Sequence, residues 1–287
     1  MKAPPFAYQR AESMAAACAL LAQHTGNARI LAGGQSLIPT LNLRLSQPEL
    51  LIDISQLTEL RGIRVTGQEM VIGALTRHAE IEKSAEVRRL FPALANAASH
   101  IAHPAIRNRG TMGGSIALAD PAAEWPAASL AFDMSITLVS TRGERVVKAD
   151  GFYKGLYETT LAPDEMLKSI HIPLPVAATQ TSFGELTRRS GDYAIAGAFV
   201  TTQKNGGKLA GTRVAFFGVS GQPMLAPGAM AALDGTTGDA AAVSAAQACL
   251  EHDLDPIADL YNSRATKLHL SRVLLGRLVA QLASHTA

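Results

Sequence analysis

Two short segments of this 287-residue chain place adjacent glycines beside a serine, and they constrain the fold more than any other feature. The first is ILAGGQSLIP, residues 30–39, and the second is RGTMGGSIA, residues 109–117. Glycine lets the backbone take positive φ and lets N–H groups approach a ligand without an intervening Cβ. Successive N–H groups turned inward form a concavity that suits phosphate oxygens. We therefore expect two distant bends of the backbone to meet around one diphosphate.

Neither segment matches a common nucleotide-binding fingerprint. No Lys-Ser or Lys-Thr pair follows the glycines, as a Walker loop requires, and neither segment fits GxGxxG in a βαβ unit. The hydroxyl groups of Ser36, Thr111 and Ser115 are additional hydrogen-bond donors. A helix that begins directly after such a bend would add positive charge. For either segment alone, an ordinary turn stays open as an interpretation.

Hairpins and helices alternate along the chain without regular βαβ repetition, which predicts an α+β fold. Strands are expected at 29–32, 50–54 and 166–172, hairpins at 62–74 and 135–148, and antiparallel strands at 182–187, 197–203 and 208–219. Helices are expected at 14–23 after a Ser13 cap, from a Thr76 cap to about 83, and at 93–101, 121–132, 227–233, 238–251 and 262–283. The segment 37–45 is expected to be a short helix or coil.

A proline-bounded stretch around residues 173–180 is the best candidate for a domain boundary. We expect one domain over 1–177, with subdomains of about 1–57 and 58–177, and a second domain over 178–287.

Composition excludes several classes of function. Hydrophobic residues make up 47% of the chain, and the formal net charge is +2 without a basic stripe, so nucleic acid is not an expected partner. No apolar run is long enough to span a bilayer, and the cytoplasm is the expected location. Cys18 and Cys249 cannot supply the four ligands of an iron–sulfur cluster, and CxxC and HExxH motifs are absent, so no metal site is expected on this chain.

The glycine segments also carry a family resemblance. ILAGGQSLIPTLNLRL together with IAHPAIRNRGTMGGSIALADPAAEWPA closely resembles the FAD-binding medium subunit of the molybdenum hydroxylases, the family of carbon monoxide dehydrogenase, xanthine dehydrogenase and the bacterial N-heterocycle dehydrogenases. The segment RRSGDYAIAGAFV, residues 188–200, is similar to the motif that opens the C-terminal domain of that family. The resemblance covers essentially the whole chain. It implies a two-subdomain FAD-binding domain of the PCMH/VAO type, then a three-stranded antiparallel sheet with a helical bundle.

The resemblance also implies which residues bind FAD. The first pyrophosphate loop would be formed by Ala32, Gly33, Gly34, Gln35, Ser36 and Leu37, and the second by Thr111, Met112, Gly113, Gly114 and Ser115. Further contacts would come from Ile101 and Ala102 along the flavin ring, the carboxylate of Glu124, the apolar Leu167 and the aromatic Tyr193. Some relatives carry Lys near Glu185, so that position receives no assignment. No residue of this chain is expected to be catalytic, because the cofactor performs the redox chemistry.

The family further implies partners. A large molybdopterin subunit and a small iron–sulfur subunit would join this chain, as a dimer of heterotrimers, and FAD would pass electrons to an external acceptor. Three alternatives stay open: a free-standing flavin reductase of the same superfamily, an assembly subunit without cofactor, and a nucleotide binder that uses one glycine loop. A free-standing reductase would be active without partners, and an assembly subunit would be colourless when purified. A one-loop nucleotide binder would still bind ATP or NAD after mutation of the other loop.

Overall fold

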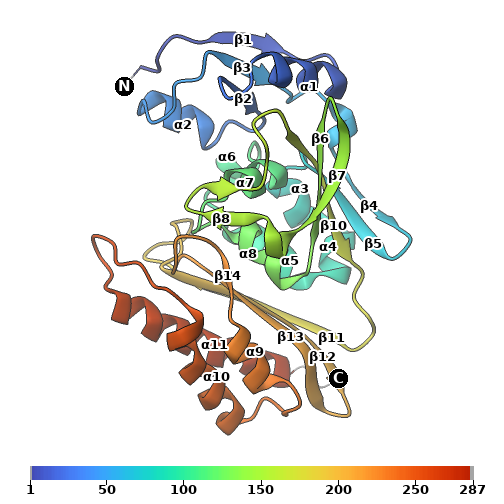
Figure 1. Ribbon diagram of the computed structural model, residues 1–287. Helices are drawn as coiled ribbons and strands as arrows, with labels where there is room; N and C mark the ends of the chain where they lie inside the picture. The colour runs from blue at the N-terminus through green and yellow to red at the C-terminus, as the bar shows by residue number, and fades with distance from the viewer. Residues whose placement is uncertain (1, 285–287) are drawn as a thin grey trace.

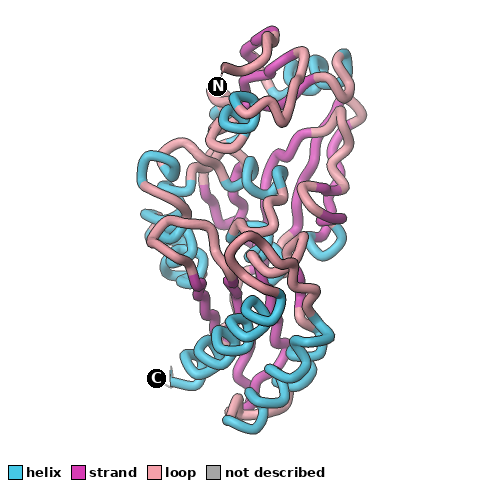
Figure 2. Tube along the Cα trace, turned by 90° about the vertical axis from the view of Figure 1, so that its left-hand side faces the viewer, coloured by secondary structure: helices cyan, strands magenta, loops and turns pink. Residues whose placement is uncertain are grey.

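In the computed structural model, which describes residues 2–284, three parts are stacked from the N-terminal end to the C-terminal helices (Figure 1). The view turned by 90° shows the same elongated stack (Figure 2). The N-terminal part lies at one end, the C-terminal helices lie at the other, and the central sheet and its helices lie between them.

The N-terminal part is a three-stranded parallel sheet in the order β1-β3-β2. Its elements are β1 (Ala7–Arg10), α1 (Met14–Gln23), β2 (Ala28–Leu31), α2 (Leu37–Asn42) and β3 (Leu50–Asp53). The Ser13 side chain caps α1 by accepting a hydrogen bond from the Ala16 N–H, as the sequence predicts. The first glycine segment follows β2 directly, so its bend lies at the carboxyl edge of the sheet.

The middle part contains a five-stranded antiparallel sheet in the order β4-β5-β10-β6-β7. Its strands are β4 (Ile63–Thr66), β5 (Glu69–Gly73), β6 (Ser135–Ser140), β7 (Gly143–Lys148) and β10 (Met166–Pro173), and both predicted hairpins are present. Its helices are α3 (His78–Lys83), α4 (Ala85–Leu90), α5 (Pro92–His100), α6 (Pro104–Arg107), α7 (Met112–Leu118) and α8 (Glu124–Ala131). Smaller elements are η1 (Thr58–Leu60), η2 (Ala149–Gly151), β8 (Tyr153–Gly155) and β9 (Glu158–Thr159).

The helices of the middle part differ from the sequence predictions in three ways. Thr76 does not cap α3, because its hydroxyl bonds the Gly62 backbone and Arg77 holds the cap position. The helices α4, α6 and α7 were not expected. The two glycines in the first turn of α7 disfavour a helix there. The predicted helix over 121–132 begins only at Glu124, because Asp120 accepts from the Ala122 N–H in a preceding turn.

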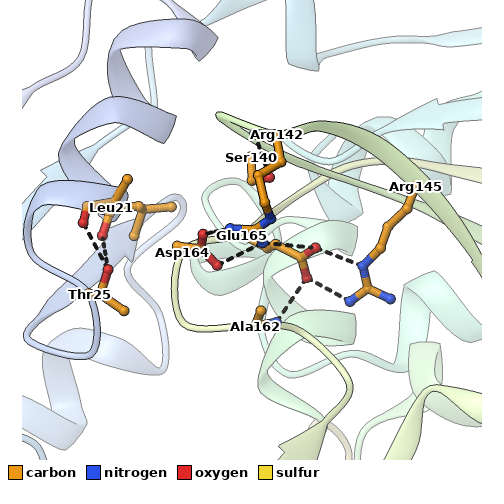
Figure 3. A network of polar contacts seen from close by, with 9 residues as sticks. Leu21, Thr25, Ser140, Arg142, Arg145, Ala162, Asp164 and Glu165 are labelled. Carbon is orange, nitrogen blue, oxygen red and sulfur yellow. Dashed lines mark hydrogen bonds and ion pairs between the residues drawn. The ribbon is translucent and has the colours of Figure 1, made fainter.

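Ion pairs fix the β6–β7 hairpin to the loop before β10 (Figure 3). The Arg145 guanidinium binds both oxygens of Glu165, at 2.7 and 2.6 Å, and Arg142 pairs with Asp164. Glu165 also accepts from the Ala162 N–H at 2.9 Å. Glu165 is buried, so these partners satisfy a carboxylate that would otherwise lack hydration.

The C-terminal part is an antiparallel sheet in the order β11-β12-β13-β14 with three helices on one face. Its elements are β11 (Thr179–Leu186), β12 (Ala196–Asn205), β13 (Lys208–Phe217), β14 (Met224–Leu225), α9 (Pro227–Leu233), α10 (Ala240–Asp253) and α11 (Arg264–Ser284). The three predicted strands are present, and the two-residue β14 adds an edge. The predicted domain boundary falls in the loop between β10 and β11.

The two faces of the C-terminal sheet belong to different cores. One face packs against α9, α10 and α11. The other presents Phe183, Phe199 and Phe217, which pack into the central core with α5 and α8. No helix within residues 2–284 is long and apolar enough to cross a membrane.

Candidate functional site

The two glycine segments touch each other. A Cβ placed on Gly33 would lie 2.2 Å from the carbonyl oxygen of Arg109 and 2.8 Å from the Cα of Gly110. Real Cβ atoms do not approach so closely, so Gly33 is needed where the N-terminal part meets the middle part. The fold therefore brings together two bends that are far apart in sequence.

The first bend presents unused backbone donors. Gly34 has φ +73°, and the Gln35 side chain donates to the Gly33 carbonyl at 3.2 Å, which folds the segment back on itself. None of the hydrogen bonds found among residues 2–284 uses the backbone N–H groups of residues 33–37. Successive unpaired N–H groups at a glycine bend form a cradle for an anion.

The second segment uses its backbone donors differently. The Gly113 N–H donates to the Ala74 carbonyl at 3.0 Å, and the Gly114 N–H donates to the Thr111 hydroxyl at 3.1 Å. Thr111 is thereby the N-cap of α7, and Met112 is buried in the central core. A Cβ on Gly113 would meet Ala74 at 2.7 Å, so this glycine serves packing. Gly114 is exposed and Ser115 is half-buried, and these two residues face outward.

A cavity of about 470 Å³ lies where the segments meet. Pockets for small molecules and cofactors typically measure about 300–1,000 Å³. Its walls are formed by Leu31, Ala32, Gly33, Gly34, Gln35, Ile38, Pro39, Asp53, Ser55 and Arg109. Asp53 and Ser55 were not among the site residues predicted from the sequence. Their place at the carboxyl end of a predicted strand could have identified them, since ligands bind at that edge of parallel sheets.

Asp53 is buried and carries hydrogen bonds that favour its charge. Its Oδ2 accepts from the Tyr8 hydroxyl at 2.5 Å, and its Oδ1 accepts from the Ser55 N–H at 2.8 Å. Burial alone would raise the pKa of Asp53, but these bonds and the Arg10 charge outweigh it, so the pKa is lowered. The cavity therefore holds a carboxylate with acceptor capacity on one wall.

Two arginines flank the second segment, and they have different environments. Arg107 pairs with Glu82 at 2.8 Å and donates to the carbonyls of Ile101 and Ala102 at 3.1 and 3.0 Å. Arg109 is exposed and lines the cavity, and its guanidinium has no hydrogen bond or ion pair within the described part of the chain. Only Arg109 is free to meet an anion.

A second cluster joins other residues predicted to bind FAD. Ala102 has φ +43°, and Arg107 fixes the carbonyls of Ile101 and Ala102. A Cβ on Gly191 would lie 2.9 Å from the Ala102 oxygen, so the loop that carries Tyr193 lies against this bend. Tyr193 is 65% exposed.

Carboxyl groups gather in this second cluster. Glu124 is the first residue of α8, and burial raises its pKa to about 8, with Glu185 and Asp120 adding to the rise. Reduced hydration raises the pKa of Tyr193 to about 12, and Asp120, Tyr157 and Glu124 contribute. The Tyr157 hydroxyl donates to Asp120 at 3.3 Å. Residues 101–102, 124 and 193 are thus brought to one region.

Leu167 and Met112 are predicted FAD contacts whose side chains are buried. Both are buried in the central core, and neither lines the cavity. A cofactor contact by either side chain stays a prediction. No group of three or more His, Cys, Asp or Glu within residues 2–284 is arranged to hold a metal.

The helix α7 connects the two regions. It begins at the second glycine segment and ends just before Asp120. Seven residues at about 1.5 Å each make it about 10 Å long. An anion cradle at one end and an aromatic and carboxyl cluster at the other fit a ligand that has a diphosphate and a separate ring. FAD has both parts, and the residues present fit it.

Comparison with known proteins identifies similar chains. The model of the FAD-binding domain in molybdopterin dehydrogenases matches residues 4–175, and that of the CO dehydrogenase flavoprotein C-terminal domain matches residues 181–282. The alpha subunit of the 6-hydroxypseudooxynicotine dehydrogenase complex of Paenarthrobacter nicotinovorans is 38% identical, over 98% of this chain and 95% of that protein.

Carbon monoxide dehydrogenases are similar in sequence and in structure. The medium chain from Hydrogenophaga pseudoflava is 39% identical over 90% of each chain. The reconstituted CO dehydrogenase from Oligotropha carboxidovorans contains a chain that superimposes with a TM-score of 0.97 at 34% identity, covering all of both chains.

Proposed function

We propose a route of electron transfer for this chain, which belongs to the FAD-binding medium subunits of the molybdenum hydroxylases. Electrons would pass from iron–sulfur clusters on a partner subunit, through FAD, to an external acceptor. FAD is the cofactor of this chain, and the chain is an oxidoreductase subunit. The route and the acceptor are the proposed parts.

The relatives support the proposed partners. Their names describe subunits and medium chains of dehydrogenases, and one is part of a named complex. Two cysteines cannot ligate an iron–sulfur cluster, so the cluster would come from a second chain. We propose a large molybdopterin subunit and a small iron–sulfur subunit as those partners, assembled as a dimer of heterotrimers.

The observation that carries the proposed binding mode is the contact between the two glycine segments beside five unused N–H groups. These groups would bind the diphosphate oxygens, and Arg109 would neutralise part of their charge. Asp53 would accept from hydroxyl groups of the adenosine half, since it is ionised and lines the same cavity.

The second cluster would position the flavin ring. When bound, FAD supplies the reversible uptake of two electrons. The Ile101–Ala102 bend and the Tyr193 loop would hold the ring between them, and Tyr193 would shield it from water. Glu124, at the start of α8, would hold a proton close to the ring.

The proposal is tested with the full chain and with the chain in its native complex. The purified chain should bind one FAD and turn yellow, and affinity purification from its native host should recover a molybdopterin subunit and an iron–sulfur subunit. Reduction of the bound FAD by substrate should need both partners. A chain that turns over an electron donor without any partner would contradict the proposed route.

A further inference from the structure

Glu185 occupies an unusual position for an acidic residue. It lies on β11 two residues after Phe183, so both side chains point to the same face of the sheet. Phe183 is buried in the central core, with its ring 5.2 Å from the ring of His100. Opposite Glu185 on β12 is Gly197, where the ring of Phe217 fills the space of a side chain. Glu185 therefore faces the edge of an aromatic core.

One oxygen of Glu185 has no partner. Its Oε2 is covered from solvent and forms no hydrogen bond among the described residues. A buried carboxylate oxygen without a partner is costly, and proteins relieve the cost by protonation or by a bound group. Burial raises the pKa of Glu185 to about 7, although the nearby His100 lowers it.

Glu124 approaches the same region from α8. Pro121, three residues before it, accepts a hydrogen bond at 2.8 Å from the N–H of Gly218, which follows the Phe217 whose ring covers Gly197. Its pKa of about 8 results first from burial and then from the charges of Glu185 and Asp120. Neither Glu124 nor Glu185 forms an ion pair with Lys or Arg within residues 2–284. Two carboxyl groups that repel each other without a compensating cation titrate as a pair and retain a proton near neutral pH.

The charged and titratable groups around the pair are few. His100 faces Glu185 from α5, and Asp120 faces Glu124 from the turn before α8. Tyr193 faces Glu124 from the loop after β11, and Tyr157 binds Asp120. The carboxylates outnumber the single histidine, so the surroundings favour proton retention.

We propose that Glu124 and Glu185 act as one proton-holding pair beside the flavin ring, and that the pair takes up a proton when the ring is reduced. This inference rests on the proposed function, which places the ring between the Ile101–Ala102 bend and the Tyr193 loop. Glu185, to which the sequence alone assigned no role, would thereby be part of the site.

The charge balance of the step is simple. Two electrons and one proton added at the ring leave one net negative charge there. That charge raises the proton affinity of the neighbouring pair, as any like charge does for a carboxylate. One proton then moves from solvent to a carboxylate oxygen of the pair. The total uptake is two protons for two electrons, and the site gains no net charge.

The experiment counts protons. The full chain is loaded with FAD and reduced with dithionite during a potentiometric titration, from about pH 6 to about pH 9, so that the pH dependence of the midpoint potential gives the protons taken up per electron pair. The native chain should approach two protons between about pH 7 and about pH 8, the range of the two pKa values. Glu185→Gln, which keeps the shape of the side chain, should approach one.

Two further variants make the result decisive. Glu124→Gln removes the other member of the pair and should also lower the count toward one. Glu12→Gln removes an exposed carboxylate from the N-terminal part and should leave the count unchanged. FAD content is measured first for each protein. A native chain that binds no FAD would contradict the proposed function as well, whereas variants that keep FAD and the native proton count would overturn the pair alone.

Discussion

Gly114 is the glycine whose substitution tests ligand approach most selectively. Its Cβ would meet only the Thr111 hydroxyl, at 2.8 Å, whereas Gly33 and Gly113 abut backbone atoms. We expect Gly114→Val to abolish FAD binding because the branched side chain would project into the phosphate's path, while the C-terminal part stays folded. Flavin absorbance of the purified variant measures FAD binding, and circular dichroism measures whether the chain stays folded. Gly151→Val is the matched control, because Gly151 has no neighbour within 4 Å of a Cβ. Native FAD occupancy in Gly114→Val would argue against the site.

Arg109 lines the cavity wall, and its guanidinium has no protein partner among residues 2–284. We expect Arg109→Met to weaken FAD binding about tenfold at low salt, and by less at high salt, because an exposed charge is screened. Isothermal titration calorimetry at two salt concentrations measures the change in the FAD dissociation constant. Arg64→Met, at an exposed position of β4, should bind as the native chain does. Equal affinities for both variants would remove Arg109 from the phosphate contacts.

His78 couples the stability of the middle part to pH. Its Nδ1 accepts from the indole N–H of Trp125 at 2.9 Å, and burial lowers its pKa from 6.5 to about 4, with a smaller effect of Arg107. Because the folded pKa lies below the unfolded one, this contribution to stability is present above about pH 6.5 and is lost as pH falls toward 4.

The loss should amount to about 3 kcal/mol of unfolding free energy between about pH 7 and about pH 4. In His78→Gln the amide oxygen accepts the same hydrogen bond without titrating, so the pH dependence should be shallower by that amount. Urea unfolding at several pH values compares the two proteins. Parallel curves would contradict the assignment to His78.

At the scale of elements, α8 depends on the sheet beneath it. The carbonyls of Leu130 and Ala131 at its C-terminus accept from Arg213 at 2.9 Å and from the Thr201 hydroxyl at 2.8 Å. Helix ends leave such carbonyls without partners, so β12 and β13 complete the helix that carries Glu124.

Removing one of these hydrogen bonds should weaken the contact between the C-terminus of α8 and the strands β12 and β13. We expect Thr201→Val to lower the free energy of unfolding by about 1–2 kcal/mol, because the buried Ala131 carbonyl loses its partner while the volume of the side chain is kept. Thr66→Val, at an exposed position of β4, should change it by less than about 0.5 kcal/mol. Urea denaturation measures the free energy of unfolding of both variants. Equal effects would show that the Thr201 hydrogen bond does not stabilise the contact between α8 and the sheet.

Local patterns predicted most elements but not those set by distant contacts. The Ser13 cap and the hairpins depend on neighbouring residues, and the structure has them. Thr76 has a capping side chain, yet its hydroxyl is taken by Gly62 of the β4–β5 hairpin. The helix α7 begins with glycines that disfavour helices, and the Thr111 cap and the contact with Ala74 stabilise it there.

In the candidate site, too, local sequence predicted some features, whereas others depend on distant contacts. The sequence indicated the first bend, since glycines before a helix need no distant partner to be recognised. It did not show that Gly33 abuts Arg109, nor that Asp53 closes the cavity, because both depend on the stacking of two parts of the chain. The use of the Gly113 and Gly114 N–H groups within the protein was also not apparent from residue types.

At the scale of the whole molecule, the stacked arrangement places the two clusters at opposite ends of α7. The anion cradle lies where the N-terminal part meets the middle part, and the ring cluster lies where the middle part meets the C-terminal sheet. A dinucleotide bound across both would link all three parts. FAD should therefore raise the unfolding temperature of the chain as one unit, by an amount that grows with the logarithm of the FAD concentration above the dissociation constant.

A structure of the chain with FAD bound would show directly where the diphosphate lies. We expect diphosphate oxygens within hydrogen-bond distance, about 3 Å, of the N–H groups at residues 33–37, with Arg109 beside them. Phosphates bound at another surface, with the first bend left empty, would contradict this expectation.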